Sequence, residues 1–302
     1  MKQSKRLALV GFGEVGRTIA RDLIALGFTD LVTYDIACTS ADSGPSRAAK
    51  ALGVTASATP DVLRDRDLVI CAVTAAQTLV AAETVAKHLD ANALYMDCNS
   101  AAPSTKQQAS RIIDAAGGRY VEAAVMTVIG PKGLQTPILL GGPHARGFLS
   151  AYVQLGLDAK VYADTVGQAS SVKMCRSVII KGIEGIMMEC LLSARHYGVE
   201  ADVLASLNDM WPGQDWTTLS GHMIRRSLQH GKRRAEEMRE VAKTVADAGV
   251  TPHMTSGAVA RHDWAAGVGK RVDGYAIQGL APVLDAVRAD ISATAKASAV
   301  KT

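Results

Sequence analysis

Hydrophobic residues follow two patterns along the chain, and one gives way to the other near residue 163. Before that point, short continuous apolar runs alternate with segments in which apolar residues recur every three to four positions, the spacing of one helix face. The runs cover residues 7–10, 31–34, 68–73, 93–96, 120–125 and 138–140. Continuous apolar runs are typical of strands in a parallel sheet that is covered on both faces. Residues 1–163 are therefore predicted to form a mainly parallel α/β domain.

After Asp164 the strand pattern ends and helical patterns continue alone. Residues 167–197 are predicted to form one long, largely apolar helix, and Gly249 followed by Pro252 marks the end of a later helix. Further helices are predicted over residues 202–207, 216–229, 233–248, 255–268 and 275–294, with a frayed tail from Thr294. Residues 164–302 are therefore expected to form an all-helical domain that the long helix connects to the first.

The first apolar run leads directly into a glycine-rich turn of the form G-x-G-x-x-G. Gly11 would allow the tight turn, Gly13 would let backbone amides approach a pyrophosphate, and Gly16 would let the next helix pack close to the strand. That helix would direct its N-terminal amides at the phosphates. Strand, turn and helix in this order predict a dinucleotide site rather than a merely structural turn. The residues expected to contact the cofactor here are Gly11, Phe12, Gly13, Glu14, Val15 and Gly16.

Asp35 ends the second apolar run, where an acidic residue of a dinucleotide site belongs. Its carboxylate would accept hydrogen bonds from the adenosine ribose hydroxyls and repel a 2′-phosphate, which favours NAD. The alternative is an ordinary aspartate in a turn after a strand. Hydroxyl-bearing residues just beyond it leave NADP open, namely Thr39, Ser40 and Ser43.

Two more strand ends are expected at the same edge of the sheet, where ligands of open α/β folds bind. Asn99 and Ser100 follow the run at 93–96 and precede Pro103, a residue suited to the first turn of a helix. Both are expected beside the reacting carbon atoms, with ordinary turn or capping roles as the alternative. The nicotinamide end of the cofactor is expected to contact Ala72, Val73, Thr74 and Asn99.

A thin polar stripe runs along the long, otherwise apolar helix. Lys173, Ser177, Lys181 and Glu184 fall within about 80° of one another in helical projection. Such a stripe favours a wet cleft, because burying it unpaired would be costly; the alternative is a surface face with a Lys–Glu pair. Lys173 is the predicted proton-transfer residue, since partial burial lowers the pKa of a lysine toward neutrality.

Composition and charge narrow the class. The 302 residues are 48% hydrophobic with a net charge of +4, and apart from Lys232–Arg234 the basic residues are dispersed, which argues against a nucleic-acid partner. The five cysteines lack C-x-x-C spacing, the histidines lack metal-ligand spacing, and no apolar stretch is long enough to span a membrane. These features predict a cytoplasmic enzyme with no metal and a small, anionic ligand.

Four ordered motifs resemble the β-hydroxyacid dehydrogenase superfamily, which includes 6-phosphogluconate and 3-hydroxyisobutyrate dehydrogenases. After the glycine turn come Asp97–Pro103, similar to D-x-S-T-x-x-P, and Glu122–Val128, where the family usually has D-A-P-V-S-G-G. The fourth motif, Gly167 to Lys173, is similar to G-x-G-x-x-x-K. The resemblance implies a Rossmann-type domain, a helical domain of a less studied branch, Lys173 as the catalytic lysine, and pairing of two chains through their helical domains.

The chain departs from the family pattern where substrate carboxylates are bound. Met126-Thr127-Val128 replaces S-G-G, Ser177 stands where an asparagine is expected, and Glu236-Glu237 falls near the family's K-D pair. The lysine role therefore transfers, whereas the carboxylate-binding role has no direct match. The residues expected to bind substrate are Asn99, Ser100, Thr127, Arg176, Ser177 and Lys181.

The sequence thus predicts an NAD(P)-dependent oxidoreductase that transfers a hydride between nicotinamide and a small polar hydroxy compound, such as a 3-hydroxy acid or sugar acid. An imine reductase shares this architecture, but imine reductases of this type usually replace the lysine, so Lys173 argues against one. A non-catalytic nucleotide-binding protein is the third alternative. The nearly all-round apolar helix 167–197 further predicts an obligate homodimer, because such a helix must be covered on every side.

Overall fold

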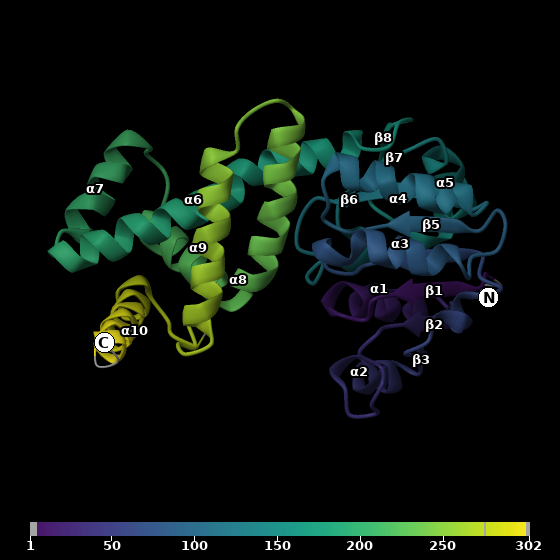
Figure 1. The fold of residues 1–302 in the computed structure, drawn as a ribbon, viewed down its shortest axis with the longest axis horizontal. Helices are drawn as coiled ribbons and strands as arrows, with labels where there is room; N and C mark the ends of the chain where they lie inside the picture. Colours follow the sequence, from purple (N-terminus) through teal and green to yellow (C-terminus); the bar gives the residue numbers. More distant parts are fainter. Residues whose placement is uncertain (1–4, 275, 300–302) are drawn as a thin grey trace. The chain divides into compact units, whose positions relative to one another are not determined.

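The computed structural model describes residues 5–274 and 276–299, without the side chains of residues 297–299. It divides into two compact units, one up to Cys175 and one from Arg176 onward (Figure 1). The sequence boundary at residue 163 follows the last strand, whereas the structure groups the first turns of the long helix with the sheet.

The first unit is built on one sheet in the order β3-β2-β1-β4-β5-β6-β7-β8. Neighbouring strands are parallel except for the antiparallel pair β6 and β7, which confirms the predicted mainly parallel sheet. The strands are β1 (Leu7–Val10), β2 (Leu31–Tyr34), β3 (Thr55–Ser57), β4 (Leu68–Cys71), β5 (Leu94–Asp97), β6 (Arg119–Val125), β7 (Ile138–Gly141) and β8 (Ala159–Ala163). The apolar runs did not predict β3 and β8, because these edge strands are partly exposed and carry polar residues.

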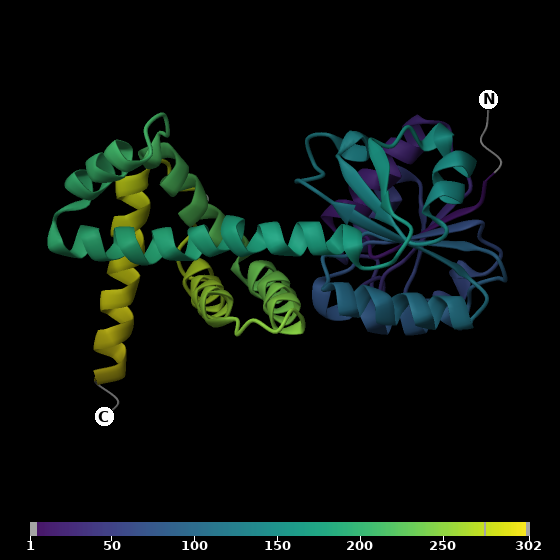
Figure 2. The ribbon, with the colours of Figure 1, turned by 90° about the horizontal axis from the view of Figure 1, so that it is seen from above.

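Helices cover both faces of this sheet (Figure 2). Helices α1 (Glu14–Ala25), α2 (Gly44–Leu52) and α5 (Ala145–Ala151) pack on one apolar core, and α3 (Thr78–Ala86) and α4 (Pro103–Ala115) pack on the other. Short 3₁₀ helices are η1 (Pro60–Leu63), η2 (Ala75–Gln77), η3 (Gly133–Gln135) and η4 (Val153–Leu155). The strand order reverses between β1 and β4, so the carboxyl ends of these strands border the crevice in which such folds bind ligands.

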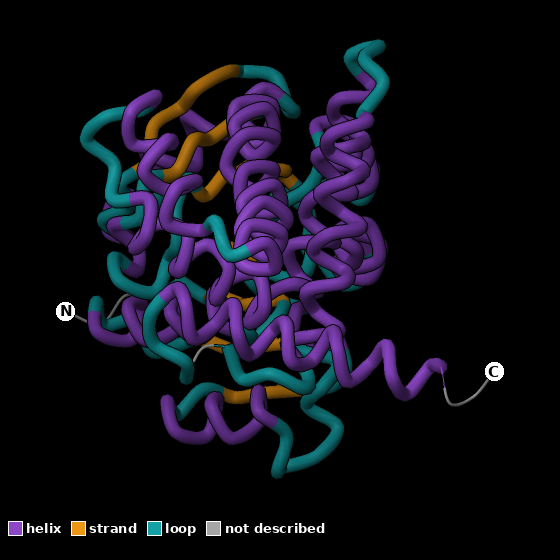
Figure 3. Tube along the Cα trace, turned by 90° about the vertical axis from the view of Figure 1, so that its left-hand side faces the viewer, coloured by secondary structure: helices purple, strands orange, loops and turns teal. Residues whose placement is uncertain are grey.

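All regular elements described in the second unit are helices (Figure 3). They are the rest of α6 (Gln168–Tyr197), α7 (Glu200–Met210), α8 (Trp216–Asp247), α9 (His253–Gly269) and α10 (Leu280–Ala299). Helices α8 and α9 touch backbone to backbone, because a Cβ on Gly231 would lie 2.6 Å from the Ala266 amide nitrogen. In the described part of the chain no helix is long and apolar enough to cross a membrane.

The predicted break between the helices at 216–229 and 233–248 is confirmed, because α8 covers both ranges and is kinked at His230, which leaves helical geometry (φ −116°, ψ 15°). The end of the last helix differs from the prediction. The last helix begins at Leu280 and continues to Ala299 instead of fraying at Thr294, since its alanine-rich end is a good helix former. The predicted start at Tyr275 lies outside the described residues.

Candidate functional site

The glycine turn has the geometry of a dinucleotide cradle. Gly11 has φ +88°, in the region that favours glycine, and a Cβ on Gly16 would lie 2.1 Å from the carbonyl oxygen of Gly11. A Cβ on Gly13, the N-cap of α1, would meet nothing within 4 Å, so the turn borders open space at this residue. Glu14 and Val15 form the first turn of α1. The residues present therefore fit a pyrophosphate at the N-terminus of α1.

Asp35 is tied to this turn by two backbone amides. Phe12 N donates to Oδ2 at 2.7 Å and Ala37 N donates to Oδ1 at 2.8 Å. The carboxylate is only partly buried. The structure thus brings Asp35 and the glycine turn together, as the sequence predicts.

Asn99 links the ends of β4 and β5. Its Oδ1 accepts a hydrogen bond from Val73 N at 2.7 Å, and its Nδ2 donates to Cys71 Sγ at 3.4 Å. The side chain is nearly fully buried, whereas Thr74 is exposed and Ala72 is half-buried. The predicted nicotinamide-end residues therefore share one strand edge, and both polar ends of the Asn99 amide hold that edge together.

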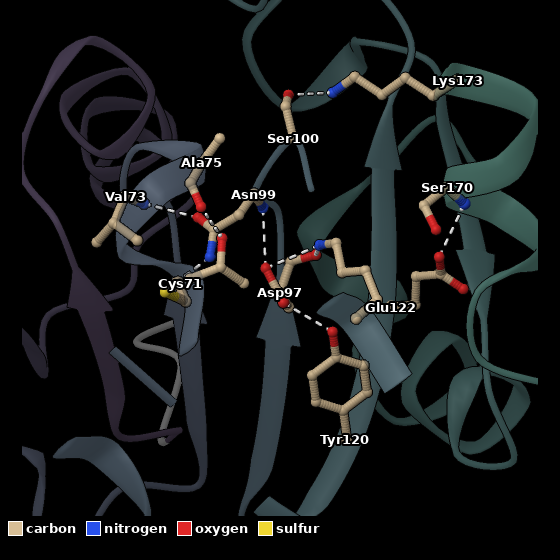
Figure 4. Close-up of polar contacts among 12 residues, drawn as sticks. Cys71, Val73, Ala75, Asp97, Asn99, Ser100, Tyr120, Glu122, Ser170 and Lys173 are labelled. Carbon is tan, nitrogen blue, oxygen red and sulfur yellow. Dashed lines mark hydrogen bonds and ion pairs between the residues drawn. The ribbon is translucent and has the colours of Figure 1, made fainter. Parts of the chain in front are cut away.

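Asp97, at the end of β5, is the centre of a fully buried polar network (Figure 4). Lys106 Nζ lies 2.8 Å from Asp97 Oδ1 and donates to the Asp97 carbonyl oxygen at 2.8 Å, and Tyr120 OH donates to Oδ2 at 2.7 Å. Burial, the nearby Asp97 charge and the hydrogen bond to it raise the pKa of the Tyr120 hydroxyl well above its usual value. Burial likewise raises the pKa of Cys71 to about 11 and that of Cys98 to about 12.

Sequence reasoning missed Lys106. The signal was available, because Lys106, Ala109, Ser110 and Ile113 follow the i, i+3, i+4, i+7 spacing and form the buried face of α4. A lysine on that face requires a buried anionic partner, which Asp97 supplies.

Lys173 and Ser100 meet at the same edge, as the sequence predicts. Lys173 Nζ donates to Ser100 Oγ at 2.6 Å, and both residues are half-buried (Figure 4). They come from α6 and from the loop between β5 and α4, 73 residues apart. A lysine amine beside a neutral hydroxyl at a strand edge can accept or donate a proton.

Glu122, the central residue of β6, is fully buried and binds the start of α6. Its Oε2 accepts from Gly167 N and its Oε1 accepts from Ser170 N, each at 2.8 Å. The sequence reasoning used Glu122 only as part of a motif and assigned it no role.

The remaining substrate-binding candidates are placed as follows. Thr127 is exposed in the loop after β6. Arg176 is exposed and Ser177 is buried, both on the part of α6 that belongs to the second unit. Lys181 forms an ion pair with Glu237 of α8 at 2.5 Å. The polar stripe therefore does not act as one surface, since Lys181 and Glu184 are both paired with α8.

A buried polar cluster joins three helices of the second unit. Glu184 of α6 forms an ion pair with Arg234 of α8, and His262 of α9 contacts the Lys181 carbonyl oxygen at 3.2 Å. Burial lowers the pKa of His262 to about 4 and raises that of Glu184. Among the described residues, no group of three or more His, Cys, Asp or Glu residues is placed to hold a metal ion.

Comparison with known proteins identifies the family to which the chain belongs. Residues 6–144 match the NAD binding domain of 6-phosphogluconate dehydrogenase, and residues 194–265 match a domain of unknown function, DUF1932. A conserved hypothetical protein from Sinorhizobium meliloti 1021 is 32% identical, with 94% of this chain and 96% of that chain covered and a TM-score of 0.71. Conserved protein MTH1747, described as structurally similar to 3-hydroxyacid dehydrogenases, is 32% identical over 89% of this chain and 99% of its own, with a TM-score of 0.64.

The fold is also that of Mycobacterium tuberculosis 3-hydroxyisobutyrate dehydrogenase, which is 15% identical, with 95% of this chain and 100% of that chain covered and a TM-score of 0.70. The sheet, the glycine cradle and the matched domain define an NAD(P)-binding protein of the oxidoreductase class. The chain belongs to the β-hydroxyacid dehydrogenase superfamily, in a branch with a helical C-terminal domain.

Proposed function

We propose that this protein is a dehydrogenase that oxidises the hydroxyl group of a small 3-hydroxy acid or sugar acid, with Lys173 as general base. The hydrogen bond from Lys173 to Ser100 at the strand edge is the observation that carries this proposal. The structural similarity of MTH1747 to 3-hydroxyacid dehydrogenases supports the same reaction class.

The proton and the hydride leave the substrate in different directions. Neutral Lys173 accepts the hydroxyl proton as the carbon–oxygen double bond forms, and Ser100 holds the resulting ammonium group in place. The bound nicotinamide supplies the hydride acceptor. In the reverse reaction the Lys173 ammonium returns the proton. Asn99 fixes the loop that carries Ser100, because its amide is anchored to the end of β4.

We further propose a preference for NAD over NADP. Each oxygen of Asp35 accepts one backbone amide, so each keeps a lone pair for a ribose hydroxyl. Because both oxygens are anchored, the carboxylate is held in place against a 2′-phosphate, and like-charge repulsion would oppose NADP.

We also propose that the protein forms a homodimer through α6. Ile179, Ile186 and Tyr197 are spaced along one stripe of α6 and are more than half exposed, at 60%, 52% and 76%. An exposed apolar stripe of this kind suits the same stripe on a second copy related by a two-fold axis. Light scattering distinguishes the dimer from a single chain of 31.7 kDa; Ile179→Asp with Ile186→Asp is expected to give the single-chain mass.

The deciding experiment is reduction of NAD⁺ and NADP⁺ by a panel of 3-hydroxy acids and sugar acids, with cyclic imines and NADPH as a second arm. We expect turnover of at least one hydroxy acid, faster with NAD⁺. Reduction of imines without oxidation of any hydroxy acid would identify an imine reductase. Tight NAD binding without turnover in either arm would identify a non-catalytic nucleotide-binding protein.

A further inference from the structure

Two buried carboxylates stand side by side at the carboxyl edge of the sheet. Asp97 of β5 and Glu122 of β6 are register partners on parallel strands, and both are 0% exposed. Partners in register direct their side chains to the same face of a sheet. Asp97 is neutralised by Lys106. In the part of the chain that the structure describes, Glu122 forms no ion pair, so its charge needs another source of stabilisation.

The start of α6 stabilises the charge of Glu122. The first amides of a helix have no acceptor within the helix and form the positive end of its dipole. Glu122 accepts the amide of Ser170 in the first turn of α6 and that of Gly167, the residue just before α6, one on each carboxylate oxygen. The buried carboxylate and the helix N-terminus therefore satisfy each other, and the arrangement is visible in Figure 4, where Ser170 is joined to Glu122.

Two glycines make this contact geometrically specific. Gly141 lies opposite Glu122 in the pairing of β6 with β7, and a Cβ there would stand 2.3 Å from Glu122 Oε2. Gly167 has φ +108°, a conformation that side chains rarely adopt. Strand β7 and the start of α6 are thus both shaped around the carboxylate that β6 carries, which is more than an exposed helix cap requires.

We propose that Glu122 is the positioning residue for Lys173, because it fixes the first turn of α6 relative to the edge of the sheet. Lys173 follows Ser170 by one helical turn, a rise of about 4.5 Å. Any displacement of that turn moves the base of the Lys173 side chain away from Ser100 and from the reacting atoms. This inference rests on the proposed role of Lys173, and its test is chosen to separate the two.

The test compares Glu122→Gln with Glu122→Asp. Glutamine can accept only one of the two amides, and its own NH₂ group faces the other, so the first turn of α6 has to shift. Because a displacement of about 1 Å can cost a factor of about 100, kcat is expected to fall by about 10- to 100-fold in Glu122→Gln. The KM for NAD should stay within about two-fold, since the glycine turn is untouched. Aspartate keeps the charge with a shorter reach and is expected to recover part of the loss.

A second readout is independent of activity. The amine of Lys173, labelled with ¹³C-methyl groups, is titrated by NMR in the wild type, in Glu122→Gln and in Glu122→Asp. Removing a buried negative charge disfavours the ammonium form, so Lys173 should titrate at lower pH in Glu122→Gln and near the wild-type position in Glu122→Asp. The other titratable groups described at this edge are unchanged in both variants, namely Asp97, Lys106, Tyr120, Cys71 and Cys98.

Thr33→Val is the matched control. Thr33 is fully buried in the same unit and donates to the Leu9 carbonyl oxygen at 3.2 Å, so the variant loses a buried hydrogen bond without touching α6. It should keep the wild-type kcat and Lys173 titration.

Wild-type kcat in both Glu122 variants, an unshifted titration in Glu122→Gln, or an equal loss of kcat in Thr33→Val would overturn the proposal. If Glu122→Gln does not fold, Glu122→Asp decides it by kcat: a partial loss supports the proposal, and a wild-type kcat overturns it. The outcome would differ if Lys173→Met kept its activity while Lys173 in Glu122→Gln still titrated at lower pH. That result would contradict the proposed function and leave the positioning role of Glu122 intact.

Discussion

Two lysines at one edge of the sheet have opposite surroundings. Lys106 lies under the end of β5, where its fully buried ammonium is paired with the Asp97 carboxylate and with a backbone carbonyl. Lys173 reaches the rim of the same segment and donates to the neutral hydroxyl of Ser100, with part of its side chain open to solvent. Their partners, Asp97 and Ser100, are only three residues apart in the sequence.

The two partners differ in a way that bears on the proton transfer proposed for Lys173. The buried Lys106 ammonium compensates the buried Asp97 carboxylate, so its contribution is to hold that carboxylate in place. A lysine beside a hydroxyl keeps a hydrogen-bond partner in either protonation state, because a hydroxyl both donates and accepts. Lys173 is therefore suited to proton transfer and Lys106 to holding the loop.

The largest effect on stability is expected from Lys106→Met. Removing the cation leaves Asp97 charged and buried without its partner, which should cost about 3–5 kcal/mol of unfolding free energy. Urea unfolding monitored by circular dichroism measures it. The double variant Lys106→Met with Asp97→Asn should regain part of the loss, whereas a single-variant cost below about 1 kcal/mol would show that the network is not structural.

Asp35→Asn should change the cofactor preference without altering the surroundings of Lys106 or Lys173. Removing the negative charge relieves the repulsion of a 2′-phosphate, worth about 1–3 kcal/mol for close charges. The ratio of kcat/KM for NAD⁺ to that for NADP⁺ should fall by about 10- to 100-fold. An unchanged ratio would show that another residue selects the cofactor.

Ser100→Ala tests the hydroxyl in the comparison. Losing a hydrogen bond to a charged group costs about 1.5 kcal/mol or more, so kcat should fall by roughly 10-fold with little change in unfolding free energy. Steady-state kinetics and urea unfolding on the same sample measure both quantities. A large loss of stability with unchanged kcat would mean that Ser100 has a structural role, like the buried Asp97–Lys106 network, and no role in turnover.

The smallest effect concerns thiol reactivity. Burial and the Asp97 charge raise the pKa of Cys71 to about 11, and burial raises that of Cys98 to about 12, so both thiols stay protonated and unreactive at pH 8. Mass spectrometry after alkylation should find them labelled only when the protein unfolds, whereas exposed Cys175 is labelled in the native state. Rapid native labelling of Cys98 would mean that the edge of the sheet opens.

Much of this account could be predicted from local patterns. The parallel strands are continuous apolar runs, and the glycine turn has a fixed spacing, so both are visible in the sequence. Ser100 and Lys173 were singled out separately and meet in the structure. The spacing of the buried face of α4 marks Lys106 as a buried lysine, although its partner Asp97 is known only from the fold. The role of Glu122 depends on partners that only folding brings together. The kink of α8 at His230 falls between the two helices that the local pattern predicts, whereas the backbone contact of Gly231 with α9 becomes visible only in the fold.

The most direct test of the central claim is Lys173→Met, with turnover and NAD binding measured on one preparation. We expect kcat to fall by about 10²–10⁴-fold, the range typical of a general acid or base, while the Kd for NAD stays within about two-fold. The unfolding free energy should remain close to wild type, in contrast to Lys106→Met. Activity within a few-fold of wild type would contradict the account, because the substrate proton would then have to leave through another group.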